Sequence, residues 1–207
     1  MTNTARWGGT WFLGACFWGM SATIAPMVAQ APPVGWREVT GRGVAVQLPP
    51  SFEGGDLEGT MPEVLQRLRL LGQDFEPTVQ AIAANRELFV LYAFDRQRGK
   101  TGALTNLNIG AAKSPANLPL ATIVDLNLKQ LPKPFRVVSR QWQGQTAVLK
   151  LEAQLEPFQI SQLQYFIQRN NMVYVLTYTT ERSEFAAREP VFRQSAATFR
   201  AIAAGPN

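Results

Sequence analysis

Histidine is absent from this chain of 207 residues, and cysteine occurs once, as Cys16. The first absence removes the commonest general base and metal ligand of proteins, and it excludes a Ser-His-Asp hydrolase. Because Cys16 lies in an apolar segment near the N-terminus, the rest of the chain has no disulfide, thiol nucleophile or cysteine-based zinc site. The sequence therefore argues against an enzyme, and we expect no cofactor and no metal. An enzyme built on paired carboxylates stays open, since such pairs meet only in three dimensions.

The chain also lacks a P-loop, a dinucleotide-binding fingerprint and a G-x-S-x-G nucleophile motif. Acidic residues gather once, in the stretch EGGDLEG that holds Glu53, Asp56 and Glu58, but their spacing matches no calcium loop and favours a solvated turn. The 20 basic and 15 acidic residues give a net charge of +5 that is spread along the chain. This distribution is typical of a mildly basic domain, and we expect no nucleic-acid partner.

The N-terminal segment has the pattern of an export signal. Residues 7–29 carry no charge and follow Arg6, which gives a basic start and an apolar continuation. We therefore predict a signal peptide or membrane anchor over residues 1–31 and a Pro-rich linker over residues 32–35. Three fates stay open: cleavage near Ala29 or Ala31, lipidation of Cys16 in the stretch LGAC, and retention as an anchor.

A single domain is predicted over residues 36–207. Its elements, in chain order, are a strand at 44–49, a loop at 51–59, two helices between residues 60 and 84, strands at 87–95 and 105–113, a helix at 117–131, two β-hairpins and a helix at 183–202. Tight hairpins imply antiparallel pairing. The strand at 87–95 is apolar on both alternating sets, which predicts helices on both sides of the sheet. The expected fold is an α+β sandwich, an antiparallel β-sheet flanked by helices on both faces.

The second hairpin, within residues 162–178, predicts its own register. A two-residue loop at Asn170-Asn171 suits a type I′ turn, because asparagine tolerates a positive φ. The predicted pairs are Ile167 with Tyr174, Tyr165 with Leu176, and Leu163 with Tyr178. We assign these tyrosines to the core, together with Phe185, Phe192 and Phe199 of the last helix.

The first hairpin provides the candidate contact surface. A three-residue turn at 142–144 would place Ser139 opposite Ala147, Val137 opposite Leu149, and Phe135 opposite Leu151. Arg136, Arg140 and Lys150 would then share the other face of this hairpin. Such a basic face could meet an acidic protein or lipid headgroups at a membrane surface, although a solvated or helix-covered face is the simpler interpretation.

From Asn106 onward the chain resembles the PsbP-like domain family of oxygenic phototrophs. The resemblance is carried by NLNIGAAKS, LATIVDLNLKQL, QGQTAVLKLEAQ, QYFIQRNNMVYVLTYTT and FRQSAATFRAI. It implies a PsbP-like sandwich and an exported accessory or assembly protein of the thylakoid lumen or periplasm. The implied partner is a membrane protein complex, with photosystem II subunits as the first choice. The alternatives are an envelope protein of the related DcrB type or a module that binds a small apolar ligand.

Overall fold

The computed structural model describes residues 33–56, 61–70, 72, 75–84, 86–97, 99–100, 102–114 and 118–202. The export segment predicted at residues 1–31 lies outside the described residues, as does Glu58 of the acidic stretch.

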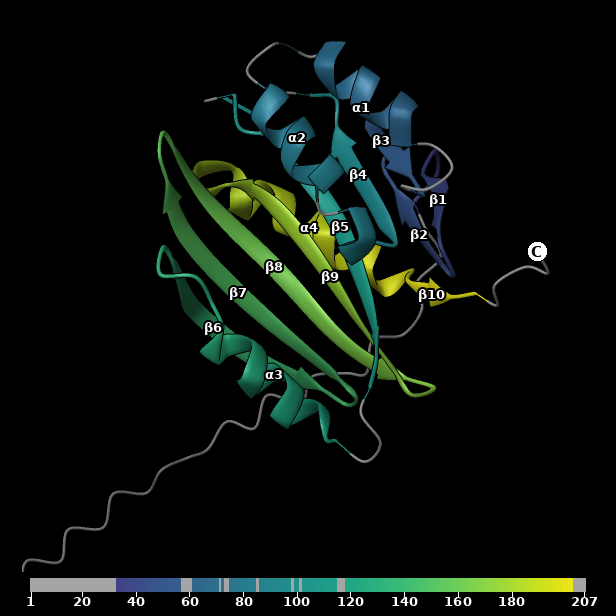
Figure 1. Ribbon diagram of the computed structural model, residues 1–207, viewed down its shortest axis with the longest axis vertical. Helices are drawn as coiled ribbons and strands as arrows, with labels where there is room; N and C mark the ends of the chain where they lie inside the picture. Colours follow the sequence, from purple (N-terminus) through teal and green to yellow (C-terminus); the bar gives the residue numbers. More distant parts are fainter. Residues whose placement is uncertain are drawn as a thin grey trace, which may run out of the picture.

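A seven-stranded antiparallel sheet forms the centre of the molecule (Figure 1). Its strands lie in the order β3 (Phe52–Gly55), β4 (Leu91–Asp95), β5 (Asn106–Lys113), β9 (Met172–Glu181), β8 (Phe158–Arg169), β7 (Thr146–Leu155) and β6 (Phe135–Gln143). A second sheet of three strands contains β1 (Arg37–Gly41), β2 (Val44–Leu48) and β10 (Arg200–Ala201).

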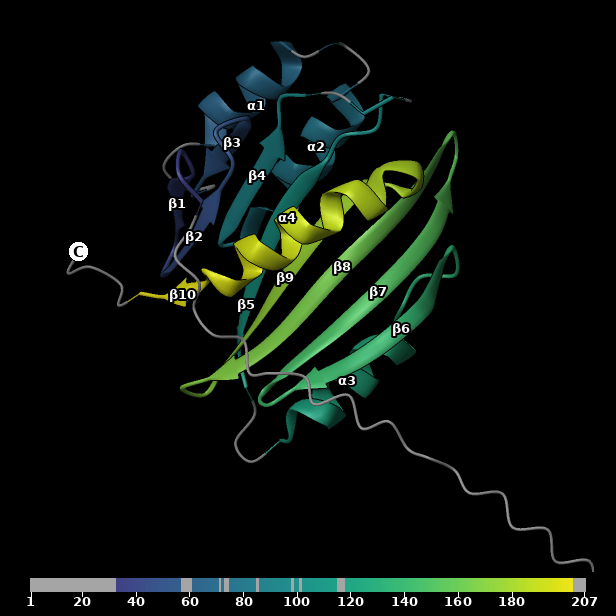
Figure 2. The same ribbon diagram turned by 180° about the vertical axis from the view of Figure 1, so that it is seen from behind.

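Helices lie on both faces of the large sheet, as predicted. Helix α4 (Phe185–Ala197), which follows the short 3-10 helix η3 (Arg182–Glu184), crosses one face beside the small sheet (Figure 2). Helices α1 (Met61–Leu70) and α2 (Glu76–Ala84), followed by the 3-10 helix η2 (Arg86–Leu88), pack against β4 on the other face. Helix α3 (Leu120–Lys129) packs on that same face against β7 and β8. The predicted α+β sandwich is confirmed.

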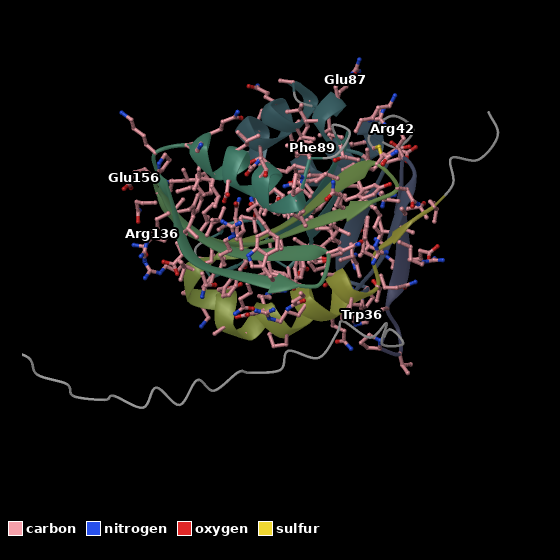
Figure 3. The ribbon with its side chains drawn as sticks, turned by 90° about the horizontal axis from the view of Figure 1, so that it is seen from below. Trp36, Arg42, Glu87, Phe89, Arg136 and Glu156 are labelled. Carbon is pink, nitrogen blue, oxygen red and sulfur yellow. The ribbon has the colours of Figure 1, made fainter. Side chains whose placement is uncertain are left out.

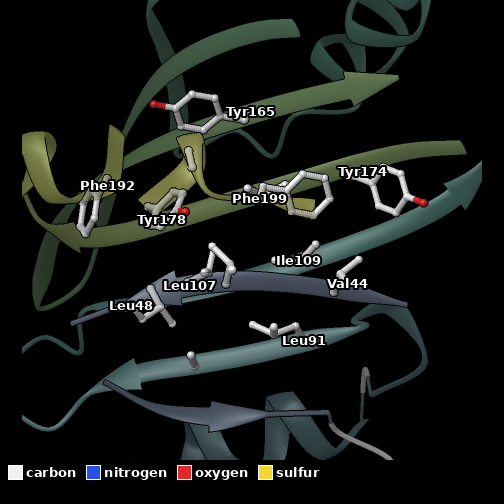
Figure 4. Close-up of a cluster of buried hydrophobic side chains, with 14 of the residues drawn as sticks. Val44, Leu48, Leu91, Leu107, Ile109, Tyr165, Tyr174, Tyr178, Phe192 and Phe199 are labelled. Carbon is white, nitrogen blue, oxygen red and sulfur yellow. The ribbon is translucent and has the colours of Figure 1, made fainter. Parts of the chain in front are cut away.

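The main core lies between the large sheet, α4 and the small sheet (Figure 4). The rings of Tyr178 and Phe192 stack with centroids 5.0 Å apart, and those of Tyr174 and Phe199 lie 5.2 Å apart. The Tyr178 hydroxyl donates to Ser195 Oγ at 3.0 Å, which satisfies a polar group that is fully buried. The aromatic residues of the second hairpin and of α4 are core residues, as the sequence predicted.

The register of the second hairpin is also confirmed. Ile167 pairs with Tyr174, Tyr165 with Leu176, and Leu163 with Tyr178. Asn170 and Asn171 adopt φ values of 51° and 59°, as both central residues of a type I′ turn require.

The register predicted for the first hairpin is wrong. Gln143 pairs with Thr146, so the loop is Gly144-Gln145 rather than a turn at 142–144. The pairing then shifts between Val137 and Ser139, which leaves Val138 as an extra residue in β6. Because a β-bulge of one residue reverses the alternation of the strand, Arg136 and Arg140 point to opposite faces.

Strand β3 was predicted to be a loop, and β1 was not predicted at all. The sequence of β3, FEGG, lacks the apolar alternation by which strands are recognised. Glycine is required at position 54 because a Cβ there would lie 2.1 Å from the carbonyl oxygen of Tyr92 on the neighbouring strand. The N-terminal part of the segment predicted as a strand at 87–95 forms η2 instead.

Candidate functional site

The helix-bearing face that carries α1, α2 and α3 is not uniformly covered. In Figure 1, α1 and α2 lie at one end of this face and α3 at the other, with the middle of β8 and β9 between them. A groove of about 460 Å³ opens there, between α3 and η2. We call it the sheet groove. The residues that line it are Glu87, Leu88, Gly110, Ala111, Ala112, Lys113, Leu118, Ile123, Leu126, Asn127, Gln130, Phe166, Val173 and Val175.

Small residues on β5 give the groove its depth. Gly110 pairs with Val175, and Val175 pairs with Phe166, so these three form one row across the floor. A Cβ on Gly110 would approach the carbonyl oxygen of Leu88 to 3.3 Å, closer than an ordinary contact. Glycine therefore lets η2 come close to the sheet and form one wall.

Helix α3 forms the opposite wall. Leu120 and Val124 are buried and fix the helix on the sheet, while Ile123 and Leu126 line the groove. Leu126 is 46% exposed, and Leu88 on the other wall is 63% exposed. Large apolar side chains in water on both sides of an apolar groove are typical of a binding surface.

A band of polar side chains on β8 and β9 continues the same face beyond the apolar floor. Gln162 Nε2 donates to Thr179 Oγ1 at 3.2 Å, and Gln164 Nε2 donates to Gln162 Oε1 at 3.2 Å. Gln164 Oε1 is buried and has no hydrogen-bond partner within the described part of the chain. The face thus combines an apolar groove with an adjacent row of amides and hydroxyls.

Arg136, Arg140 and Lys150 do not form the single basic face that the sequence predicted. Arg136 Nη2 lies 2.5 Å from Glu152 Oε2 on the α4 side of the sheet, where Lys150 Nζ lies 4.2 Å from the centroid of the Phe185 ring. Arg140 is on the α3 side, with Nη1 2.6 Å from Asp125 Oδ1. The bulge at Val138 is the cause of this separation.

A second arginine, which the sequence did not indicate, lies beside Arg136 in the structure. Arg182 of η3 approaches the same carboxylate, with Nε 3.4 Å from Glu152 Oε2. The two arginines border a separate, smaller pocket of about 160 Å³. Arg182 directly follows β9 and Arg136 lies on β6, so the two are far apart in sequence. Only the folded sheet brings both to the Glu152 carboxylate.

The acidic stretch contributes to the fold through ion pairs. Glu53 Oε2 lies 3.6 Å from Arg67 Nη1, and Glu53 Oε1 lies 3.3 Å from Arg96 Nε. Over the described residues, no group of three or more acidic side chains is arranged to hold a metal ion. None of the helices in this part of the chain has the length and apolar character needed to cross a membrane.

Burial determines the ionisation of three core tyrosines. It raises the pKa of Tyr165 to about 12, and it raises the pKa values of Tyr92 and Tyr178 further. All three belong to packed clusters rather than to the sheet groove. They are structural groups.

No protein-family model and no curated relative matches the chain. Among solved structures, it is similar to cyanobacterial PsbP (CyanoP) of Synechocystis, with 11% identity, a TM-score of 0.52, and coverage of 83% of this chain and 97% of that chain. It is also similar to the Ran-binding protein Mog1p of Saccharomyces cerevisiae, with 9% identity, a TM-score of 0.49 and coverage of 81% and 95%. LpqN of Mycobacterium tuberculosis, involved in cell envelope biogenesis, has 12% identity, a TM-score of 0.45 and coverage of 79% and 88%. The likeness to CyanoP is one of fold: the chain has a PsbP-like α+β architecture.

Proposed function

We propose that this chain is an exported, non-enzymatic accessory protein that docks on a membrane protein complex through the sheet groove. The observation that carries the docking is the exposure of Leu88 and Leu126 on the two walls of an apolar groove. Because both leucines reach solvent, apolar side chains presented by a protein partner can contact them at the mouth of the groove.

Photosystem II, or one of its assembly intermediates, is the proposed complex. This choice follows from the resemblance of the C-terminal half of the chain to the PsbP-like family, and the fold shared with CyanoP supports it. The proposed compartment is the thylakoid lumen or the periplasm, because the uncharged stretch at residues 7–29 has the pattern of an export signal. Mass spectrometry of the native N-terminus would distinguish cleavage, lipidation of Cys16 and retention.

Affinity enrichment from solubilised photosynthetic membranes tests the docking. The tagged chain is expected to enrich photosystem II subunits, and Leu126→Asp is expected to reduce that enrichment severalfold because it places a charge in an apolar contact. Leu70→Asp is the matched control, since Leu70 is 79% exposed on α1 and does not line the groove. Failure of the unmodified chain to enrich photosystem subunits would count against the choice of complex. Equal enrichment by Leu126→Asp would count against the groove.

A small apolar ligand is the second candidate occupant. The groove volume of about 460 Å³ falls within the range of roughly 300–1,000 Å³ that ligand sites occupy, and its floor is apolar with few polar groups. A fluorescent fatty-acid probe would be expected to bind the chain with one-to-one stoichiometry and to lose affinity in Leu126→Asp. Binding that Leu70→Asp reduces equally would place the probe elsewhere on the surface.

A further inference from the structure

We propose that Arg136 and Arg182 form a docking site for a carboxylate side chain of an acidic protein partner. This site lies on the α4 side of the large sheet and does not depend on the sheet groove, which is on the other face. Figure 3 shows Arg136 at the outer edge of the molecule, far from Trp36 and Arg42.

The first argument is the balance of charge. Both guanidinium groups approach a single oxygen, Glu152 Oε2, at 2.5 Å for Arg136 and 3.4 Å for Arg182. Glu152 is 11% exposed, whereas Arg136 and Arg182 are 65% and 50% exposed. Two cations therefore share one largely buried anion, and one further carboxylate would make the cluster neutral.

The second argument is the supply of hydrogen-bond donors. Each guanidinium has five N–H donors in a planar fork that fits a carboxylate. The contacts with Glu152 use only a fraction of these donors, and the exposed remainder borders the small pocket. Gln159 lines the same pocket and can donate a further N–H bond, whereas Gln154 Nε2 already donates to Glu156 Oε1 at 3.3 Å.

The third argument concerns the number of basic residues and selects an acidic protein over a membrane surface. The two arginines border a pocket of about 160 Å³, which has room for the carboxylate of one acidic side chain. A membrane surface would need a cluster of about four to eight basic residues. Lys150 instead lies against the Phe185 ring, and Arg140 points to the opposite face.

Side-chain NMR of the full chain tests the site. Titration with a short polyglutamate peptide is expected to shift the Nε–H signals of Arg136 and Arg182, while a polyglutamine peptide of equal length should not. Arg136→Gln and Arg182→Gln should each weaken binding by about tenfold, as expected for one charge-assisted hydrogen-bonded pair. Glu152→Gln should strengthen binding, because it removes the competing carboxylate.

Arg69→Gln is the matched control, since Arg69 is 53% exposed and pairs with Glu76 on α2. It should leave the affinity unchanged. Arg136→Lys and Arg182→Lys preserve the charge opposite Glu152, and with it the fold, but lose the planar fork, so they should also bind more weakly. Equal affinity in all arginine variants would overturn the proposal. Binding to phosphatidylglycerol vesicles or inorganic phosphate that requires both arginines, without binding to polyglutamate, would also overturn it.

Discussion

Asp95 and Arg188 form a buried ion pair that joins β4 to α4. Asp95 is fully buried, and its Oδ2 lies 2.5 Å from Arg188 Nη1, while Oδ1 accepts a hydrogen bond from the backbone N–H of Gln97 at 3.0 Å. A carboxylate in this position depends on its cation, because removal of one partner leaves an uncompensated charge in the protein interior.

Arg188→Ala is therefore expected to lower the free energy of unfolding by about 3 kcal/mol in chemical denaturation. Arg69→Ala breaks an exposed pair with Glu76 that solvent screens, so it should lower the free energy of unfolding far less. If the two substitutions cost the same, the Asp95 carboxylate does not rely on Arg188.

Tyr165 makes stability depend on pH in the alkaline range. Burial raises its pKa from 10.0 to about 12 in the folded state. The folded protein therefore holds this proton more tightly than the unfolded chain does, and the stabilisation is complete below pH 10. It is lost as the pH rises from 10 through about 12.

We expect the free energy of unfolding to fall between pH 10 and pH 12, and Tyr165→Phe to reduce this slope. Urea unfolding at a series of alkaline pH values measures both quantities. Tyrosinate absorbance that rises fully at pH 10, while the protein stays folded, would contradict the assignment.

At the scale of elements, the second hairpin is held in register by its turn as well as by its side chains. Asn171 has a φ of 59°, a left-handed conformation that costs residues other than glycine and asparagine about 1–2 kcal/mol. Asn171→Ala should accordingly lower the free energy of unfolding by about 1 kcal/mol, and Asn171→Gly should preserve or raise it. Thermal unfolding of both variants is the measurement, and equal loss in both would show that the asparagine side chain matters rather than the backbone conformation.

The two hairpins show how far the sequence determines a sheet. In the second hairpin, the Asn170-Asn171 loop and the alternating apolar residues agree on one register, so it could be predicted. In the first, β6 is the outer strand and is largely exposed, so its side chains constrain the register only weakly. Nothing in its pattern distinguishes Val138 as the bulged residue, and this single residue removed Arg140 from the predicted basic face.

At the scale of the whole molecule, the candidate site could not be predicted, because its two walls, η2 and α3, and its floor on the sheet come from separate segments of the chain. Leu88 was expected inside a buried strand, but η2 exposes it at the groove. Leu126 gave a usable signal: it lies off the apolar stripe that buries Leu120 and Val124, so it had no role in the core. An unexplained leucine on an otherwise amphipathic helix is such a hint, although the groove opposite it appears only once β5 and η2 are in place.

The two faces of the sheet thus have different characters. The face with α4 and the small sheet holds the main core, with the Arg136–Arg182 site at its outer edge. The face with α1, α2 and α3 leaves an apolar groove beside a polar band. The α4 face holds the largest buried cluster, and the uncovered part of the other face is where we place the docking of a partner.

Site-directed photo-cross-linking in intact photosynthetic membranes tests this central claim most directly. A photoreactive residue at position 126 should cross-link the chain to a photosystem II subunit, while the same residue at position 70, which is more exposed and lies on α1 outside the groove, should not. Cross-links of equal yield and identity from both positions, or none to a membrane complex from position 126, would contradict the account.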